Sequence, residues 1–284
     1  MRKTAFVILL LLLTVNSQQL TANSLSVLTW NTGRMGGFAK PEKNKVLQYL
    51  MQQDADVVCL QEVDVYKDAK FLTLPDVKRT LGKKYPYSYI DFSVYNQRHQ
   101  YGTMVWSKYP LVNKQSIHYE TSGNLSNRCD IAVGKDTFRL INNHLESYKF
   151  THEDIQEIES IRDYKGIRAT LKRLKAKWDR AVPLRNNQAK VVREEIDNSP
   201  YPVIVVGDFN SPAWSFAYQH IAENLQDAWN ETHYFWEMGN TCEKRGLGVR
   251  IDYILSASPL RPVRCNVIET TGSDHRPVVA TLEW

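Results

Sequence analysis

The chain has 284 residues, of which 43% are hydrophobic and 24% are charged, and its net charge is +5 at pH 7. Its 15 tyrosines and 7 tryptophans exclude a disordered or fibrous chain, because such chains lack the large apolar side chains that build a core. The length suffices for one large core and allows one or two domains.

The first residues are typical of an export signal. Arg2 and Lys3 form a short basic region, an apolar run from Ala5 to Val15 follows, and polar residues come next. Because this run is too short to span a bilayer comfortably, we predict a signal peptide within residues 1–24, cleaved after position 17 or 24. We therefore expect an exported protein, periplasmic or secreted, and an uncleaved membrane anchor is the less favoured alternative.

Apolar runs that predict buried strands alternate with helical patterns in the rest of the chain. A helix is predicted to begin at Pro41, and a second one follows the β-branched run Pro202–Val206, which is the clearest buried strand. The predicted strands are residues 25–30, 56–60, 101–107, 116–121, 128–133, 137–142, 203–206, 251–255, 263–268 and 278–284. This alternation predicts an α/β fold with mixed sheets covered by helices.

A long polar helical region is predicted from about residue 151 to residue 198. Four of its apolar residues recur at spacings of four, three and four positions: Ile167, Leu171, Leu174 and Trp178. This spacing predicts an amphipathic helix with one face packed on the rest of the protein. Pro183 is expected to separate this helix from a second one that reaches Ile196, because proline disfavours a helix interior.

The positive charge of the chain is concentrated in this helical region. Between Arg162 and Arg193 there are eleven Lys and Arg residues against two Asp, so the remainder of the chain is net negative. The basic 162–193 segment could contact a nucleic-acid backbone or an anionic lipid headgroup, and it could equally be the solvated face of a helix. It carries no base-reading motif, so the sequence leaves these alternatives open.

The four cysteines are Cys59, Cys129, Cys242 and Cys265. Cys59 lies in a buried strand pattern and is expected to be a core thiol. Export would permit disulfides, and Cys242 and Cys265 could pair, but their spacing cannot establish it. The sequence contains no Cys-x-x-Cys motif or Cys–His clustering, so it predicts no zinc site.

Polar residues that can bind a metal ion or transfer a proton lie at the ends of the predicted strands. They are, in chain order, Asn31, Glu62, His144, Asp208, Asn210, Asp252, Asp274 and His275. Ends of packed strands can direct side chains into a common cleft. Carboxylate and amide oxygens suit Mg²⁺ or Mn²⁺, and imidazoles beside them can contact phosphate oxygens and transfer protons. This combination favours metal-assisted hydrolysis of a phosphoester.

Six short motifs, taken together, resemble those of the endonuclease/exonuclease/phosphatase superfamily. They are Leu28–Asn31, Leu60–Val63, Asn142–Leu145, Val206–Asn210, Arg250–Ile254 and Gly272–Pro277. Each motif alone is weak, and their number and order make the resemblance specific. The resemblance implies a four-layer α/β/β/α sandwich of two mixed β-sheets flanked by helices. It also implies a single catalytic domain over residues 25–284, with the helical, basic insertion at about 151–198.

The resemblance implies a site for a divalent cation. Asn31, Glu62 and Asp274 would be its ligands, with Asp274 acting directly or through a water molecule. Mg²⁺ is the expected ion and Mn²⁺ the alternative. A second ion near Asp208 stays open.

The resemblance also implies roles at the phosphate group. Asp208 would position or deprotonate the attacking water, and Asn210 would orient phosphate and water. His275 would act at the scissile phosphate while Asp252 holds it, and His144 would be the second catalytic histidine. Each of these residues also has a purely structural alternative, which the sequence alone leaves open.

These roles predict a divalent-metal-dependent phosphoester hydrolase, preferentially a phosphodiesterase of endonuclease type that uses a metal-activated water. One alternative is a lipid- or inositol-phosphate phosphatase or a phospholipase C-like hydrolase. Another is an inactive binding module on the same fold. Tyr234–Trp236 is the best candidate for an exposed aromatic loop near the substrate, and the protein is expected to be a monomer.

Overall fold

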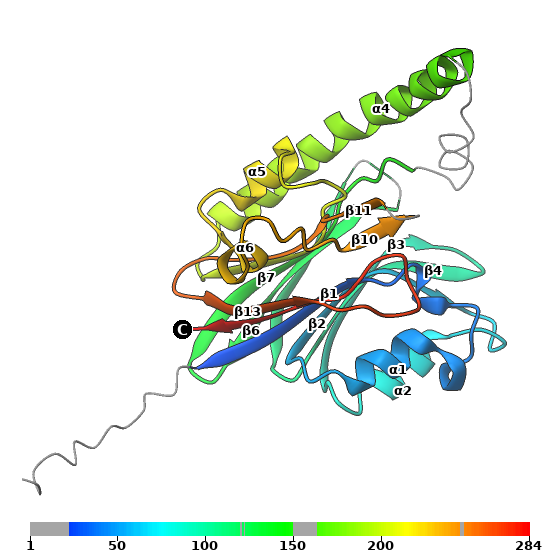
Figure 1. Cartoon of the computed structure of the whole chain (residues 1–284). Coiled ribbons are helices and arrows are strands. Elements are labelled where there is room, and N and C mark those ends of the chain that lie inside the picture. The colour runs from blue at the N-terminus through cyan, green and yellow to red at the C-terminus, as the bar shows by residue number, and fades with distance from the viewer. Residues whose placement is uncertain (1–22, 120, 122, 150–163, 245–246) are drawn as a thin grey trace, which may run out of the picture.

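The computed structural model describes residues 23–119, 121, 123–149, 164–244 and 247–284. In this part of the chain two six-stranded sheets lie face to face, with helices outside them (Figure 1). The first sheet has the spatial order β13 (Arg261–Val267), β14 (Val278–Glu283), β1 (Ser24–Asn31), β2 (Val57–Tyr66), β4 (His99–Ser107) and β3 (Tyr87–Tyr95). The second has the order β5 (Leu111–His118), β6 (Leu125–Val133), β7 (Asp136–His144), β8 (Val203–Asp208), β12 (Asp252–Ser256) and β9 (Gln226–Asp227).

The remaining elements lie around these sheets. A short antiparallel pair consists of β10 (Cys242–Lys244) and β11 (Leu247–Val249). The helices are α1 (Lys45–Gln52), α2 (Leu74–Leu81), α4 (Tyr164–Asp197), α5 (Phe216–Ala222) and α6 (Ala228–Thr232). Both large sheets are mixed, because β1 pairs with β2 and β7 with β8 in parallel while their other neighbours are antiparallel.

Three hydrophobic clusters define the layers of the fold. One lies between the sheets and includes Val27 and Val57 of the first and Leu140 and Ile204 of the second. Another joins α1 and α2 to the outer face of the first sheet, and a third joins α4 and α5 to the outer face of the second. The central strands are apolar on both faces because both faces are covered. The predicted four-layer sandwich of two mixed sheets is therefore confirmed.

Helix α4 differs from its prediction in two respects. It is continuous through Pro183, where two helices were expected. Its second half is held by tertiary packing, since a row of residues at helical spacing is buried there: Ala181, Arg185, Ala189, Val192 and Ile196. That packing outweighs the hydrogen bond that proline cannot donate. The predicted packing of the first half is wrong for Leu171, whose side chain is 59% exposed, and this half extends away from the sheets (Figure 1).

Several predictions concern residues outside the described ranges. The expected signal peptide falls almost entirely on residues 1–22, and the start of the basic segment, with Arg162, falls within residues 150–163. No helix in the described part of the chain is both long enough and apolar enough to cross a membrane. Cys242 and Cys265 are both buried free thiols, so the structure does not join them.

Candidate active site

Strand pairing brings the predicted site residues to one edge of the two sheets. In the second sheet Asp208, at the end of β8, is paired with His144 at the end of β7 and with Asp252 at the start of β12. In the first sheet Asn31, at the end of β1, is the register partner of Gln61 in β2. The sheets are stacked, so these two strand ends face each other across the sandwich.

Asn31 connects the two sheets at this edge. Its Nδ2 donates to Glu62 Oε1 (3.2 Å) and to Asp208 Oδ2 (2.9 Å). On the far side of Glu62, His144 Nε2 lies 3.6 Å from Oε1, and this buried nitrogen has no hydrogen-bond partner in the described structure. Two carboxylates from different sheets therefore converge on one amide, with an imidazole beside them.

An irregularity in β2 directs Glu62 into the site. The register between β2 and β4 shifts between Leu60 and Val63, which is where a β-bulge re-aims a side chain. The φ angle of Glu62 is +51°, a conformation that residues other than glycine and asparagine adopt rarely. Burial raises the pKa of Glu62, but His144 and then Asn31 favour the charged form more, and the pKa falls to about 2. Glu62 is therefore ionised at neutral pH.

Asp252 orients His275. Its Oδ2 lies 2.9 Å from His275 Nδ1 and accepts a hydrogen bond of 2.7 Å from Thr241 Oγ1. The other ring nitrogen, Nε2, lies 3.9 Å from Asp208 Oδ2. Burial lowers the pKa of His275, but Asp252 and Asp208 outweigh it and raise the pKa well above its usual range. His275 is thus held as a proton donor that faces Asp208.

Asp208 and Asn210 are fixed by the backbone around them. Gly207 has φ +123°, and a Cβ atom there would lie 2.1 Å from the carbonyl oxygen of Asn143, so only glycine fits. Asn210 has φ +49°, and its backbone N–H donates to Asp208 Oδ1 (2.7 Å). Its amide nitrogen donates to the Leu145 carbonyl and to Asp208 Oδ2. Asn210 therefore holds the Asp208 carboxylate in place.

Asp274 has a different environment from the other predicted ligands. Its side chain is exposed, and one of its carboxylate oxygens lies within 4.8 Å of a ligand atom of Cys242 and of His275. Six predicted residues thus form one connected row, in the order His144, Glu62, Asn31, Asp208, His275 and Asp252, and a seventh, Asn210, joins it at Asp208. Asp274 is attached to this row through its neighbour His275.

Sequence patterns missed three contributors to the site. Thr241, in a loop, binds Asp252, and Ser273 accepts from His275 N while its hydroxyl donates to the Asn31 carbonyl (2.8 Å). Tyr101 packs edge-on against His144 with ring centroids 6.4 Å apart. Burial, followed by the nearby carboxylates, raises the pKa of Tyr101 above its usual range, so the phenol stays neutral.

The donor atoms fit a hard divalent cation. Glu62 and Asp208 both direct an oxygen at the Asn31 amide, so negative charge converges at one point of the edge. Convergent carboxylate oxygens are ligands that Mg²⁺ and Mn²⁺ prefer. Glu62 and Asp208 are therefore best placed to hold the ion, and the Asn31 amide oxygen, which accepts from Gly33 N at 3.1 Å, would join them if the amide turned.

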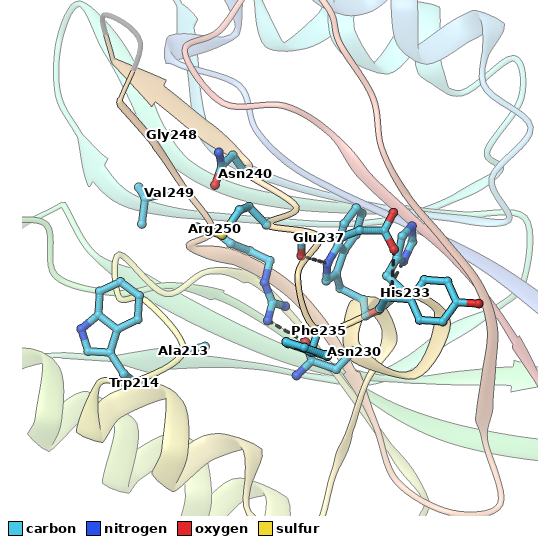
Figure 2. Close-up of a pocket in the computed structure, with 13 residues that line it drawn as sticks. Ala213, Trp214, Asn230, His233, Phe235, Glu237, Asn240, Gly248, Val249 and Arg250 are labelled. Atoms are coloured by element: carbon cyan, nitrogen blue, oxygen red, sulfur yellow. Dashed lines mark hydrogen bonds between the residues drawn. The ribbon is translucent and has the colours of Figure 1, made fainter.

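An aromatic pocket of about 390 Å³ is formed by segments that adjoin some of these residues in sequence (Figure 2). It is close to the site along the chain, since Arg250 precedes Asp252 by two residues and Ala213 follows Asn210 by three. The lining includes Trp214 and Phe235, which are 78% and 94% exposed. Arg250, which also lines the pocket, donates a hydrogen bond to Asn230 and forms an ion pair of 2.7 Å with Asp227. The pocket thus offers flat apolar walls.

Comparison with known proteins identifies the family. The model of the endonuclease/exonuclease/phosphatase family matches residues 28–275. The chain belongs to the endonuclease/exonuclease/phosphatase family. This match covers all eight predicted site residues, and the resemblance drawn from the six motifs is confirmed. Members of the family are generally phosphoester hydrolases and typically use a divalent metal.

Solved structures of the family share this fold. An endonuclease/exonuclease/phosphatase from Beutenbergia cavernae DSM 12333 has a TM-score of 0.67 at 16% identity, over 92% of this chain and 71% of its own. Truncated Caenorhabditis elegans TDP2 has a TM-score of 0.63 at 21% identity, over 92% of this chain and 98% of its own. Sphingomyelinase C from Streptomyces griseocarneus has a TM-score of 0.60 at 18% identity, over 91% of this chain and 99% of its own. Comparison with curated protein sequences gives no match.

Proposed function

We propose that the protein is a Mg²⁺-dependent phosphodiesterase of endonuclease type that uses water as the nucleophile. The observation that carries this proposal is the connected row of carboxylates, amide and imidazoles from His144 to Asp252. A phosphodiester is anionic and repels a water nucleophile, so its hydrolysis needs positive charge and directed proton transfer. The row supplies acceptors and donors of protons within one site.

The residues divide into two sets by the part that they can take in proton transfer. Asp208 is an anchored carboxylate that can orient an attacking water and accept its proton. His275, whose pKa is raised by Asp252 and Asp208, can donate a proton or a charged hydrogen bond to a phosphate oxygen. His144, whose pKa is raised by Glu62 despite its burial, can add a second charged donor. A bound divalent cation would neutralise a phosphate oxygen and lower the charge that the water must approach.

The aromatic pocket supports nucleic acid as the substrate. A planar base next to the scissile phosphate would find flat walls in Trp214 and Phe235, and such stacking is tolerant of sequence. Exposed basic residues of α4 such as Lys172 and Lys175 could contact the backbone of a longer strand.

A lipid phosphodiester is the second candidate, because the same aromatic loop is very exposed. Phe235 and Met238 present 94% and 69% of their surfaces to solvent, which is unusual for large apolar side chains. Such a loop could enter the boundary of a bilayer while the headgroup reaches the site. A lipid- or inositol-phosphate phosphatase fits the same residues.

Turnover of four substrates with and without EDTA tests the proposal. We expect EDTA-sensitive cleavage of plasmid DNA and of a bis-ester, with less turnover of a mono-ester or of phospholipid vesicles. His275→Ala should abolish cleavage, and His118→Ala, which removes an exposed histidine on β5, should leave it intact. No EDTA-sensitive turnover on any of these substrates would contradict the proposal, and turnover of the lipid alone would favour the second candidate.

We further propose export to the periplasm or the medium, and a monomeric state. Export is supported by the apolar run Ala5–Val15 that follows Arg2 and Lys3. Fractionation of cells that express the full chain tests export, and retention of the protein in the cytoplasm would contradict it. Light scattering after size exclusion gives the mass, and a dimer would contradict the monomeric state.

A further inference from the structure

Cys242 is a buried thiol beside the catalytic site that phosphoester hydrolysis does not require. Its side chain is 4% exposed, and the residue faces His275 in an antiparallel bridge. One ligand atom of Cys242, one of Asp274 and one of His275 all lie within 4.8 Å of one another. Thiolate sulfur, imidazole nitrogen and carboxylate oxygen are the ligands of zinc and of softer divalent metals.

The backbone fixes the thiol opposite the imidazole. Cys242 and His275 are partners in an antiparallel bridge. The two backbone hydrogen bonds that flank this bridge, 3.2 and 2.6 Å long, come from the residues on either side of the pair. The pair itself is therefore not hydrogen-bonded through the backbone, and this is the type of pair whose side chains approach most closely. Two of the ligands are thus held together before any ion binds.

The imidazole also has the outer support that metal-binding histidines usually have. His275 Nδ1 lies 2.9 Å from Asp252 Oδ2, which leaves Nε2 as the nitrogen for a metal. Histidine ligands commonly donate the other ring N–H to a carboxylate, which fixes their tautomer. Asp274 is exposed, so an ion can reach the buried thiol from its side.

We propose that Cys242, His275 and Asp274 form a second metal site, which binds Zn²⁺ or a similar thiophilic cation and inhibits the enzyme. Mg²⁺ should not compete there, because it prefers oxygen ligands. Bound Zn²⁺ would occupy the His275 nitrogen that faces the phosphate, so this nitrogen would no longer donate to a phosphate oxygen. The inhibition rests on the proposed function, whereas the binding of the ion does not.

Cadmium binding tests the site without any substrate. Cd²⁺ is titrated into the reduced full-length protein, and the ultraviolet charge-transfer band from thiolate to cadmium is recorded. We expect a band that saturates at one ion per chain, is lost in Cys242→Ala and is kept in Cys265→Ala, a matched buried thiol on β13. Thermal unfolding is used to check that both variants fold. If Cys242→Ala does not fold, Cys242→Ser replaces it.

Inhibition of bis-ester hydrolysis in excess Mg²⁺ tests the consequence. The Zn²⁺ concentration for half-inhibition should be at least about tenfold higher in Cys242→Ala than in Cys265→Ala. Loss of a residue that only supports a metal ligand already weakens metal binding by roughly 10–100-fold, so loss of a ligand should weaken it at least as much. A missing band in the wild type, or a band that persists without Cys242, overturns the site. Equal inhibition of both variants overturns its inhibitory role. If no substrate is hydrolysed, the proposed function fails while the cadmium result still decides the site.

Discussion

Replacing Asp252 with asparagine should separate the charge of this residue from its hydrogen bonds. Asp252 Oδ2 accepts from Thr241 Oγ1 at 2.7 Å and lies 2.9 Å from His275 Nδ1, whereas the buried Oδ1 has no hydrogen-bond partner. The amide oxygen of Asn would therefore replace Oδ2, and the amide nitrogen would replace Oδ1. The imidazole should keep its orientation and its tautomer, so the variant lacks only the carboxylate charge.

The structure sets the expected size of the effect. Unit charges about 4 Å apart attract by about 4 kcal/mol at an effective dielectric constant of about 20. Since about 1.4 kcal/mol changes a rate tenfold, this attraction corresponds to at most roughly a thousandfold. Part of it already acts in the ground state, so we expect kcat to fall on the order of 10²- to 10³-fold with little change in KM.

Steady-state hydrolysis of a bis-ester in saturating Mg²⁺ is the assay. Asp130→Asn is the matched control, because Asp130 is also a fully buried carboxylate, paired with Arg139 at 2.8 Å, but lies outside the site. The control should lose stability and keep its kcat. A folded Asp252→Asn variant whose kcat stays within about threefold of the wild type would refute the reasoning, because Asp252 would then have no electrostatic role.

Three further predictions concern the cation, the stability and the thiols. Glu62→Gln should raise the Mg²⁺ concentration for half-maximal activity by roughly 10- to 100-fold, and a Mg²⁺ titration unchanged from the wild type would contradict the ligand role. Thr73→Ala, which removes the hydroxyl of the α2 capping box, should lower the free energy of unfolding in urea by about 1 kcal/mol. Thr73 lowers the pKa of Asp76, so this carboxylate stabilises the fold fully above its unfolded pKa, and the stabilisation is lost as the pH falls below about 4. The difference in unfolding free energy between variant and wild type should therefore shrink in acid. Burial raises the pKa of Cys129 and Cys265 to about 12, so iodoacetamide should label neither thiol in the native protein and both in guanidinium. Mass spectrometry measures the labelling, and labelling of either thiol in the native protein would contradict its burial.

The sequence predicted the strands that are buried on both faces, because their apolar runs have no other explanation. Strand β8 is the clearest case, and the polar residues that follow it lie at the edge where the structure assembles the site. Strand β3 was not predicted, because most of its residues are half-buried and its pattern neither alternates nor forms an apolar run. Such a strand is specified by its pairing with β4, which no local pattern encodes.

Contacts between distant residues were beyond the reach of sequence patterns. Thr241 lies 11 residues before Asp252, in a segment without recognisable structure, and its hydroxyl is nonetheless the partner of that carboxylate. The pairing of Cys242 with His275 was hidden for the same reason, since the two residues are 33 positions apart in sequence and are joined by a bridge between two segments. Pro183 shows the converse, because a strong local signal was overridden by the packing of α4 against the second sheet.

Backbone conformation explains part of the residue choice in the motifs. Glu62, Gly207 and Asn210 all have positive φ, and each lies where a strand stops pairing regularly or ends. Glycine and asparagine tolerate this conformation and glutamate does not, so positions 207 and 210 of the motif Val206–Asn210 meet steric needs while Asp208 between them carries the proposed catalytic carboxylate. Glu62 is held against its preference by the bulge and by the Asn31 amide. Strain of this kind costs on the order of 1–3 kcal/mol and persists where the surrounding structure fixes it, so the positive φ of Glu62 supports the proposal that this residue has a functional role.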